Sequence, residues 1–214
     1  MRLLHFGLLF AATSSRTIIA SADGLPVPPL PPWYPLQAWQ ITSLSTYNPH
    51  ESPYSANSSG LLLMISNVQQ IAAAPAPHAS GGGYVVFQKS TAQCELHWKA
   101  DQFTPYGHSS NSCVTDIIPN DYSNPRWQVT LNELHTDLSA PGDYYFSLGF
   151  QLTYNGTIYA TQAYKLMTGS ASFRASTNLE GECGDDGLCE YRVRNESLPV
   201  LLQPTLQECK SACG

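Results

Sequence analysis

Five carboxylates fall within eleven residues near the C-terminal end of the sequence, the densest group of side chains able to do acid–base or metal chemistry. Paired carboxylates hydrolyse glycosides at separations of about 5–10 Å, and clustered carboxylate oxygens bind Ca²⁺. The group lacks the EF-hand spacing, and nothing in the sequence marks one carboxyl as a buried general acid. Solvated acids in a disulfide-closed loop are therefore favoured over a Ca²⁺ site or a glycosidase site. The five residues are Glu180, Glu182, Asp185, Asp186 and Glu190.

The histidines and serines show no spacing typical of a catalytic or metal site. HExxH is absent, and so is the GxSxG turn of serine hydrolases, since Gly169-Ser170-Ala171-Ser172 lacks the second glycine. His97 lies on the polar face of its expected strand, as surface histidines do. We therefore predict no catalytic residue, no metal ligand and no cofactor. The histidines that follow residue 22 are His50, His78, His97, His108 and His135.

The first 22 residues are typical of a secretory signal peptide. Arg2 precedes an apolar run at 3–12, and Ala20-Ser21-Ala22 fits a small-x-small cleavage site. The run is too short to span a bilayer, which takes about 20 apolar residues. Cleavage would leave Asp23 at the N-terminus, which argues against a lytic oxygenase because such enzymes need an N-terminal histidine. We expect a signal peptide at 1–22, a Pro-rich linker at 23–37 and a secreted β domain at 38–214.

Charge is sparse and acidic, which bears on the choice of partner. Without Arg2 and Arg16 the chain keeps eight basic and sixteen acidic residues, a net charge of −8. No basic run or face is present, so nucleic acid and anionic membranes are poor partners. The most apolar later segment, at 60–66, suits a buried strand and is too short for a membrane span.

The cysteines and the glycosylation sequons both fit the secretory route. An even number of cysteines in a secreted chain predicts disulfides, and these are Cys94, Cys113, Cys183, Cys189, Cys209 and Cys213. A Cys94–Cys113 bridge would close a polar loop and contribute about 3 kcal/mol. The sequons begin at Asn57, Asn155 and Asn195.

Residues 143–163 carry the clearest structural signal. Apolar and polar residues alternate there with a period of two, which is typical of a half-buried β-strand. The apolar positions are Tyr144, Phe146, Leu148, Phe150, Leu152 and Tyr154. Asn155-Gly156 suits the two positive-φ positions of a type I′ turn, so we predict the hairpin turn there, with 158–161 returning antiparallel.

Similar two-faced segments recur along the chain, separated by turn residues. In the expected strands at 91–99 and 126–134, Cys94, Trp98 and Trp127 fall on the apolar face. The pattern predicts an all-β, antiparallel sandwich or barrel of eight to ten short strands. It does not distinguish a sandwich from a barrel. The other expected strands are 39–46, 61–66, 84–88, 188–193 and 198–202.

The C-terminal tail is the one helical candidate. Thr205 and Glu208 fit a capping box, which would place Cys209 and Cys213 at i and i+4 of a short helix. A helix holds such a pair slightly too far apart for an easy bridge. We therefore expect each of them to bond to one of Cys183 and Cys189, with the pairing left open.

Aromatic residues outside the strands are candidates for a binding surface, because exposed rings stack on sugars. Those in the linker and loops are Trp33, Tyr34, Tyr47, Tyr54 and Tyr106. A glycan on Asn155 would keep the hairpin tip away from a partner, so we expect any binding face at the opposite end of the hairpin or in the 47–59 and 101–125 loops.

The chain resembles the small secreted cysteine-containing proteins of filamentous fungi, many of which are effector candidates. The resemblance rests on Trp39-Gln-Ile-Thr-Ser-Leu, Ala92-Gln-Cys94 followed by Trp98, Cys113, Trp127-Gln-Val-Thr-Leu and the segment at 178–189. The first half is also similar, more loosely, to the β-barrel major-allergen family of Alternaria fungi. The insertion at 72–83 and the cysteine-bearing tail depart from that pattern.

The resemblance implies a stable extracellular module and brings no catalytic residues. We expect a secreted, effector-like protein that binds a host or cell-wall protein or glycan and does not catalyse a reaction. A carbohydrate-binding module is the first alternative, and a secreted hydrolase is the second.

Overall fold

The computed structural model describes residues 35–47, 58–77, 79, 82–99, 111–116, 123–135, 144–183 and 189–213. These ranges hold fourteen strands and no α-helix, and none of their helical segments is long and apolar enough to cross a membrane. The predicted all-β antiparallel class is therefore confirmed, with more strands than the eight to ten expected. The expected signal peptide at 1–22 and most of the Pro-rich linker lie outside the described residues.

The first sheet has seven strands in the order β11-β12-β1-β2-β5-β7, with β13 paired to β1. Its longest pairings are antiparallel and join β2 to β1 on one side and to β5 on the other. Gly60 of β2 lies opposite Tyr47 of β1, and Asn67 of β2 lies opposite Ser90 of β5. The strand bounds are β1 Trp39–Tyr47, β2 Ser58–Asn67, β5 Ser90–Lys99, β7 Val114–Thr115, β11 Leu179–Cys183, β12 Cys189–Val193 and β13 Val200–Leu202.

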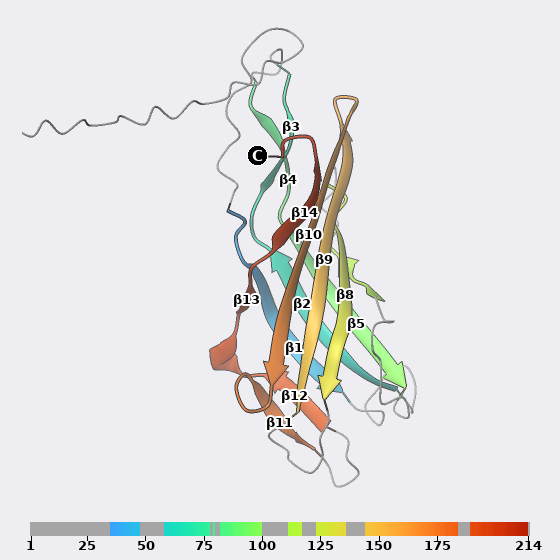
Figure 1. Ribbon diagram of the computed structural model, residues 1–214, viewed down its shortest axis with the longest axis vertical. Coiled ribbons are helices and arrows are strands. Elements are labelled where there is room, and N and C mark those ends of the chain that lie inside the picture. Colours follow the sequence, from blue (N-terminus) through green and yellow to red (C-terminus); the bar gives the residue numbers. More distant parts are fainter. Residues whose placement is uncertain are drawn as a thin grey trace, which may run out of the picture.

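The second sheet has five strands in the order β14-β10-β9-β8-β6. Its bounds are β6 Asn111–Ser112, β8 Arg126–His135, β9 Tyr145–Ile158, β10 Thr161–Arg174 and β14 Thr205–Lys210. A separate two-stranded sheet pairs β3 (Ile71–Pro75) with β4 (Tyr84–Phe87), and a short 3₁₀ turn, η3, spans Asn195–Ser197. Figure 1 shows β8, β9 and β10 lying over β1, β2 and β5 as two layers.

The core lies between these two layers. Trp39 of β1 meets Trp127 of β8 edge to face, with ring centroids 4.7 Å apart, and both side chains are buried. Phe87 of β4 stacks on Tyr154 of β9 at 4.9 Å, which joins the small sheet to the same core. Because the two sheets face each other across one core, the architecture is sandwich-like. The predicted inward position of Trp127 is confirmed; the side chain of Trp98 lies outside the described residues.

The polar groups of the core are paired across the layers. Trp127 Nε1 donates to Ser90 Oγ at 3.1 Å, and the Tyr154 hydroxyl donates to the Gln88 carbonyl at 2.8 Å. Asn67 Nδ2 donates to the Tyr154 hydroxyl at 2.9 Å. These bonds fix the relative position of the sheets, since a buried polar group without a partner costs about 1–3 kcal/mol.

The β9–β10 hairpin exists as expected, but the predicted turn at Asn155-Gly156 is wrong. The strands run on to Ile158 and Thr161, and the turn lies at Tyr159 and Ala160, both with positive φ. A turn at Asn155-Gly156 would have placed Ile158 opposite Thr153 on the solvent face. The later turn keeps Ile158 in phase with Tyr154 and buries it, so burial outweighed local turn preference.

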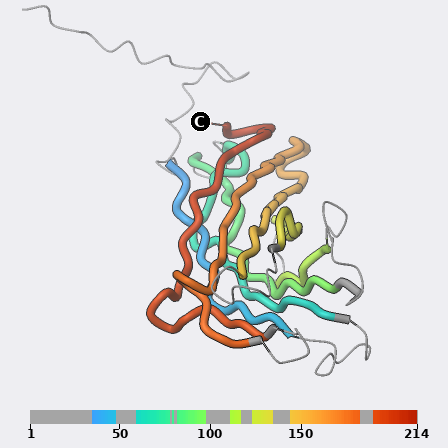
Figure 2. The backbone as a smooth tube through the Cα atoms, turned by 60° about the horizontal axis from the view of Figure 1, so that its bottom comes forward, coloured from blue at the N-terminus to red at the C-terminus, as the bar shows by residue number. Residues whose placement is uncertain are grey.

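The predicted C-terminal helix is also wrong. Residues 205–210 form β14, which pairs with β10 from Thr205 opposite Thr168 to Lys210 opposite Tyr164. Figure 2 shows this dark red segment alongside the orange β10. Edge pairing with a long strand satisfies more backbone groups than one isolated helical turn, whose nucleation is costly.

The disulfides confirm one expectation and correct another. Cys94 and Cys113 are bonded as predicted, with Cα atoms 4.2 Å apart. Cys209 bonds to Cys213, with Cα atoms 5.7 Å apart, and not to Cys183 or Cys189. The bridge forms because the chain after β14 is a tight turn and not a helix: Ser211 and Ala212 both have positive φ. Cys183 and Cys189 lie directly opposite each other in the β11–β12 hairpin.

Candidate functional site

Small uncharged polar residues cover the outer face of β8, β9 and β10. Thr130 of β8 lies opposite Gly149 of β9, which lies opposite Ser170 of β10. A second row, two positions along the strands, crosses four strands through Gln128, Gln151, Thr168 and Thr205. Because side chains alternate between faces, both rows face outward while Phe150 and Leu152 are buried beneath them.

This face is hollowed at its centre. The hollow has a volume of about 450 Å³ and none of its ten lining residues carries a charge. We call it the polar hollow, and define it by Thr130, Asn132, Gly149, Phe150, Gln151, Thr168, Gly169, Ser170, Gln203 and Thr205.

Gly149 forms the floor of the polar hollow. A Cβ atom at Gly149 would lie 3.0 Å from Asn132 Nδ2 and 3.1 Å from Asn132 Oδ1, so the Asn132 amide extends over this glycine. Asn132 reaches this position because the β8–β9 register shifts between Leu131 and Glu133, which makes it the extra residue of a β-bulge. The missing side chain leaves room for the Asn132 amide, which forms part of the lining of the hollow.

Neighbouring side chains orient the polar groups of the rim. Gln151 Nε2 donates to Gln128 Oε1 at 2.9 Å, and Gln207 Nε2 donates to Thr168 Oγ1 at 2.9 Å. Gln203 Nε2 donates to the Leu36 carbonyl at 2.6 Å. These contacts hold amide oxygens and hydroxyl groups over β9 and β10, which are paired on both sides, and this favours a preorganised binding surface.

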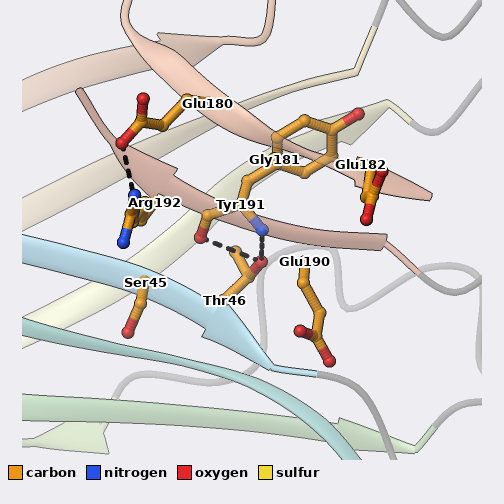
Figure 3. Close-up of a pocket in the computed structure, with 8 residues that line it drawn as sticks. All are labelled: Ser45, Thr46, Glu180, Gly181, Glu182, Glu190, Tyr191 and Arg192. Atoms are coloured by element: carbon orange, nitrogen blue, oxygen red, sulfur yellow. Dashed lines mark hydrogen bonds and ion pairs between the residues drawn. The ribbon is translucent and has the colours of Figure 1, made fainter.

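A second hollow, the acidic cleft, lies beside the β11–β12 hairpin (Figure 3). It has a volume of about 480 Å³ and is lined by Ser45, Thr46, Glu180, Gly181, Glu182, Glu190, Tyr191 and Arg192. Thr46 Oγ1 accepts from the Tyr191 N–H at 2.8 Å and lies 3.3 Å from the Tyr191 carbonyl, so it links β1 to β12. Burial raises the pKa of the Tyr191 phenol above its ordinary value.

Three of the five acids that the sequence singled out line the acidic cleft, while Asp185 and Asp186 lie outside the described residues. Glu180 forms an ion pair with Arg192 at 2.7 Å, and Figure 3 shows it turned away from Glu182 and Glu190. Glu182 is exposed to solvent. A general acid of a glycosidase needs a carboxyl shielded from water, and Glu182 has no such shielding.

The described residues contain no group of three or more His, Cys, Asp or Glu side chains placed to hold a metal ion. The Ca²⁺ alternative for the acidic segment therefore finds no support from Glu180, Glu182 and Glu190. Two of these three are cross-strand partners, and the third is bonded to Arg192.

His97 lies in a small hydrogen-bonded cluster on the outer face of the first sheet. The Tyr47 hydroxyl lies 2.6 Å from His97 Nδ1 and 3.3 Å from Glu95 Oε1. His97 Nε2 lies 3.7 Å from Glu95 Oε1. Gly60 lies beneath the Tyr47 ring, where a Cβ atom would come within 2.2 Å of Tyr47 Cζ. The cluster packs three side chains over β2 and gives Tyr47 and His97 a structural role.

The other candidates from the sequence fall mainly outside the described residues. These are Trp33, Tyr34, Tyr54 and Tyr106 among the aromatic residues, His50, His78 and His108 among the histidines, and Asn57 among the sequons. Asn155 is exposed within β9 and Asn195 is exposed in η3. The expected binding loops at 47–59 and 101–125 lie largely outside the described ranges as well.

The polar hollow was not anticipated from the sequence. Its signal was present as Ser147, Gly149, Gln151 and Thr153, which alternate with the apolar residues of the strongest strand. Polar residues at such positions usually mark a solvated sheet face. The hollow becomes visible only when the bulge at Asn132 and the register with Ser170 are known.

Comparison of the chain with protein-family models, with curated proteins and with solved structures gave no match.

Proposed function

We propose that this chain is a secreted, effector-like protein of a fungus that acts by binding a target at a host or cell surface, without catalysis. The polar hollow is the binding surface in this proposal. The single observation that carries it is an uncharged, hydrogen-bonding hollow of about 450 Å³ over β9 and β10, two strands with a neighbour on each side.

The position of the hollow supports binding. Its floor belongs to β9, which pairs over its whole length with β10 and along most of its length with β8. Binding sites on rigid strands are held more precisely than sites on loops. A preorganised surface also lowers the entropy lost when a ligand binds.

The residue types of the hollow support binding over turnover. Thr130, Thr168, Ser170 and Thr205 supply hydroxyl groups, but a hydroxyl nucleophile needs an adjacent base. No His, Asp, Glu or Lys is among the residues that line the hollow. Amides and hydroxyls in this arrangement suit reversible recognition.

Secretion and glycosylation are part of the proposal. The Cys94–Cys113 and Cys209–Cys213 bonds are typical of oxidising compartments such as the secretory route. Exposed Asn155 and Asn195 are accessible to a glycosyltransferase. Culture medium of an expressing fungus should contain the protein without residues 1–22, and N-glycosidase treatment should lower its apparent mass.

Surface binding is the direct test. Fluorescently labelled protein should bind saturably to intact host tissue or to fungal cell walls, and an excess of unlabelled protein should displace it. A second portion, reduced and heat-unfolded, serves as the control for non-specific adhesion. Linear, non-displaceable uptake on every surface, equal for folded and unfolded protein, would contradict the proposal.

A further inference from the structure

We infer that the polar hollow binds a neutral glycan chain that lies across β8, β9, β10 and the start of β14. This inference rests on the proposed function, because it names the ligand class of that same surface. It is carried by the charge, the hydrogen-bonding groups and the shape of the hollow.

The lining of the hollow favours a ligand without charge. All ten lining residues are uncharged, so a charged ligand would lose hydration without gaining an ion pair. Of the charged groups elsewhere on this face, Glu133 accepts from the Tyr145 hydroxyl, and Arg174 lies over the Tyr145 ring, 4.7 Å from its centroid. Arg126 and Glu208 are exposed in the next row of side chains, and neither lines the hollow. The hollow is therefore matched to an uncharged ligand.

The hydrogen-bonding groups of the hollow favour a ligand rich in hydroxyl groups. Three side-chain amides and four hydroxyls line the hollow, and each of these groups can both donate and accept. Sugar hydroxyls have the same dual capacity. An apolar ligand would cover these groups without satisfying them, which costs free energy for every group left unpaired. The chemistry of the hollow thus selects a polyhydroxylated ligand over an apolar one.

The width of the hollow favours a ligand of several linked units. The lining crosses four neighbouring strands, a width of roughly 14 Å at the usual strand spacing. That length suits several linked rings of an oligosaccharide. Gly149 lies near the middle of this path, beneath the Asn132 amide, so a larger side chain there would displace one of the amides that line the hollow.

A peptide is disfavoured by the same geometry. Extended peptides usually bind by adding a strand to a sheet edge, where backbone groups are unpaired. Six of the ten lining residues belong to β9 and β10, each of which has a paired strand on both sides, and only Thr205 belongs to the edge strand β14. Its binding groups are therefore side chains.

The hollow contains no exposed aromatic ring, because its one aromatic residue, Phe150, is only 3% exposed. Ring stacking therefore adds nothing to binding, and we expect weak affinity that depends on multiple hydrogen bonds.

The test uses the full secreted protein and defined neutral oligosaccharides: the β-1,4-glucan, β-1,3-glucan, xylan, mannan and chitin series, with oligogalacturonate as the charged comparison. Binding is followed by isothermal titration and by NMR shifts of the Gly149, Gln151 and Ser170 amides. Gly149→Val fills the floor in a strand where valine is favourable. Ser147→Val, on the same face of the same strand and outside the hollow, is the matched control.

We expect at least one neutral series to bind and to shift these amides. Gly149→Val should weaken that binding by about tenfold or more, and Ser147→Val should change it by less than about twofold. Ser170→Val provides a second obstruction if Gly149→Val folds poorly, as judged by its thermal unfolding. Equal binding by all variants, preference for oligogalacturonate, or no binding of any neutral series would overturn the inference.

Surface binding distinguishes this failure from failure of the proposed function. If labelled protein binds cells saturably, but protease treatment of the cells abolishes binding and Gly149→Val leaves it unchanged, the partner is a protein bound elsewhere. The proposed function then stands and the glycan site does not. If no surface binds, the proposed function itself fails.

Discussion

The ammonium group of Lys165 lies 2.9 Å from Sγ of Cys209 and is shielded completely from solvent. It also donates to the carbonyls of Ser211 and Ala212, the two residues with positive φ that follow β14. The Cys209–Cys213 bond closes this turn. The last residues of the chain are thus attached to β10 through one buried cation.

The first prediction concerns the pH dependence of stability through Lys165. Burial lowers the pKa of this ammonium to about 8, below its value near 10.4 in an unfolded chain. Between these values the unfolded chain binds more protons, so the free energy of unfolding should rise with pH, by at most about 1.4 kcal/mol per unit. Urea unfolding between pH 8 and 9.5 measures this.

Lys165→Met is the control, since methionine keeps the length of the side chain without the titrating group. Its stability should rise less across the same range than that of the wild type. The pH range stops at 9.5 to avoid the ionisation of tyrosines. Burial raises the pKa of Tyr144 and Tyr191 in the folded protein, so at higher pH these residues would ionise first in the unfolded chain and lower the free energy of unfolding. Parallel curves for the two proteins would show that Lys165 does not titrate in this range.

The second prediction concerns the β9–β10 turn. Tyr159 and Ala160 have φ values of 47° and 63°, a region that costs a non-glycine residue about 1–2 kcal/mol. Replacing the pair by Asn-Gly should therefore raise the free energy of unfolding by about 1 kcal/mol. Ala163→Gly, in the extended and buried part of β10, should lower it. The prediction fails if both changes act in the same direction.

In the β9–β10 hairpin, the strands could be predicted from the sequence and the position of the turn could not. Period-two alternation predicted the strands correctly, because burial of residues such as Leu148 and Leu152 dominates their energetics. The turn was misplaced because Asn155-Gly156 is the better local turn, whereas burial of Ile158 is a tertiary effect.

Two further features depended on contacts distant in sequence. Thr205 to Glu208 fits a helix cap locally, but β10 offered these residues an edge to pair with, and the Cys209–Cys213 bond followed from that pairing. The polar hollow depends on a bulge at Asn132 and on the register between β8 and β9. Neither property can be obtained from a single segment.

The third prediction compares two buried tryptophans. Trp127 Nε1 donates to Ser90 Oγ at 3.1 Å, whereas Trp39 Nε1 is buried without a hydrogen-bond partner among the described residues. Both substitutions by phenylalanine remove similar volume. Trp127→Phe should cost about 1 kcal/mol more than Trp39→Phe, because it also deprives Ser90 of a donor. Thermal and urea unfolding of both variants measure the difference, and a larger cost at Trp39 would contradict this account.

The last prediction concerns the contact of Gly60 with Tyr47. A Cβ atom at Gly60 would lie 2.2 Å from Tyr47 Cζ and 2.6 Å from the Leu96 carbonyl oxygen. The tyrosine ring would have to leave its place beside His97, and the β5 backbone would also have to shift. Gly60→Ala should therefore lower the free energy of unfolding by about 1–3 kcal/mol, the usual cost of overpacking.

Gly149→Ala provides the matched control for this effect. Its Cβ atom would meet only the movable amide of Asn132, at 3.0 Å, so the neighbour can yield by a few tenths of an ångström. We expect a change within about 0.5 kcal/mol, because only one movable side chain has to shift. Urea unfolding of the two alanine variants under one set of conditions gives the comparison. An equal loss at both positions would show that glycine content itself, and not the Tyr47 contact, sets the cost at Gly60.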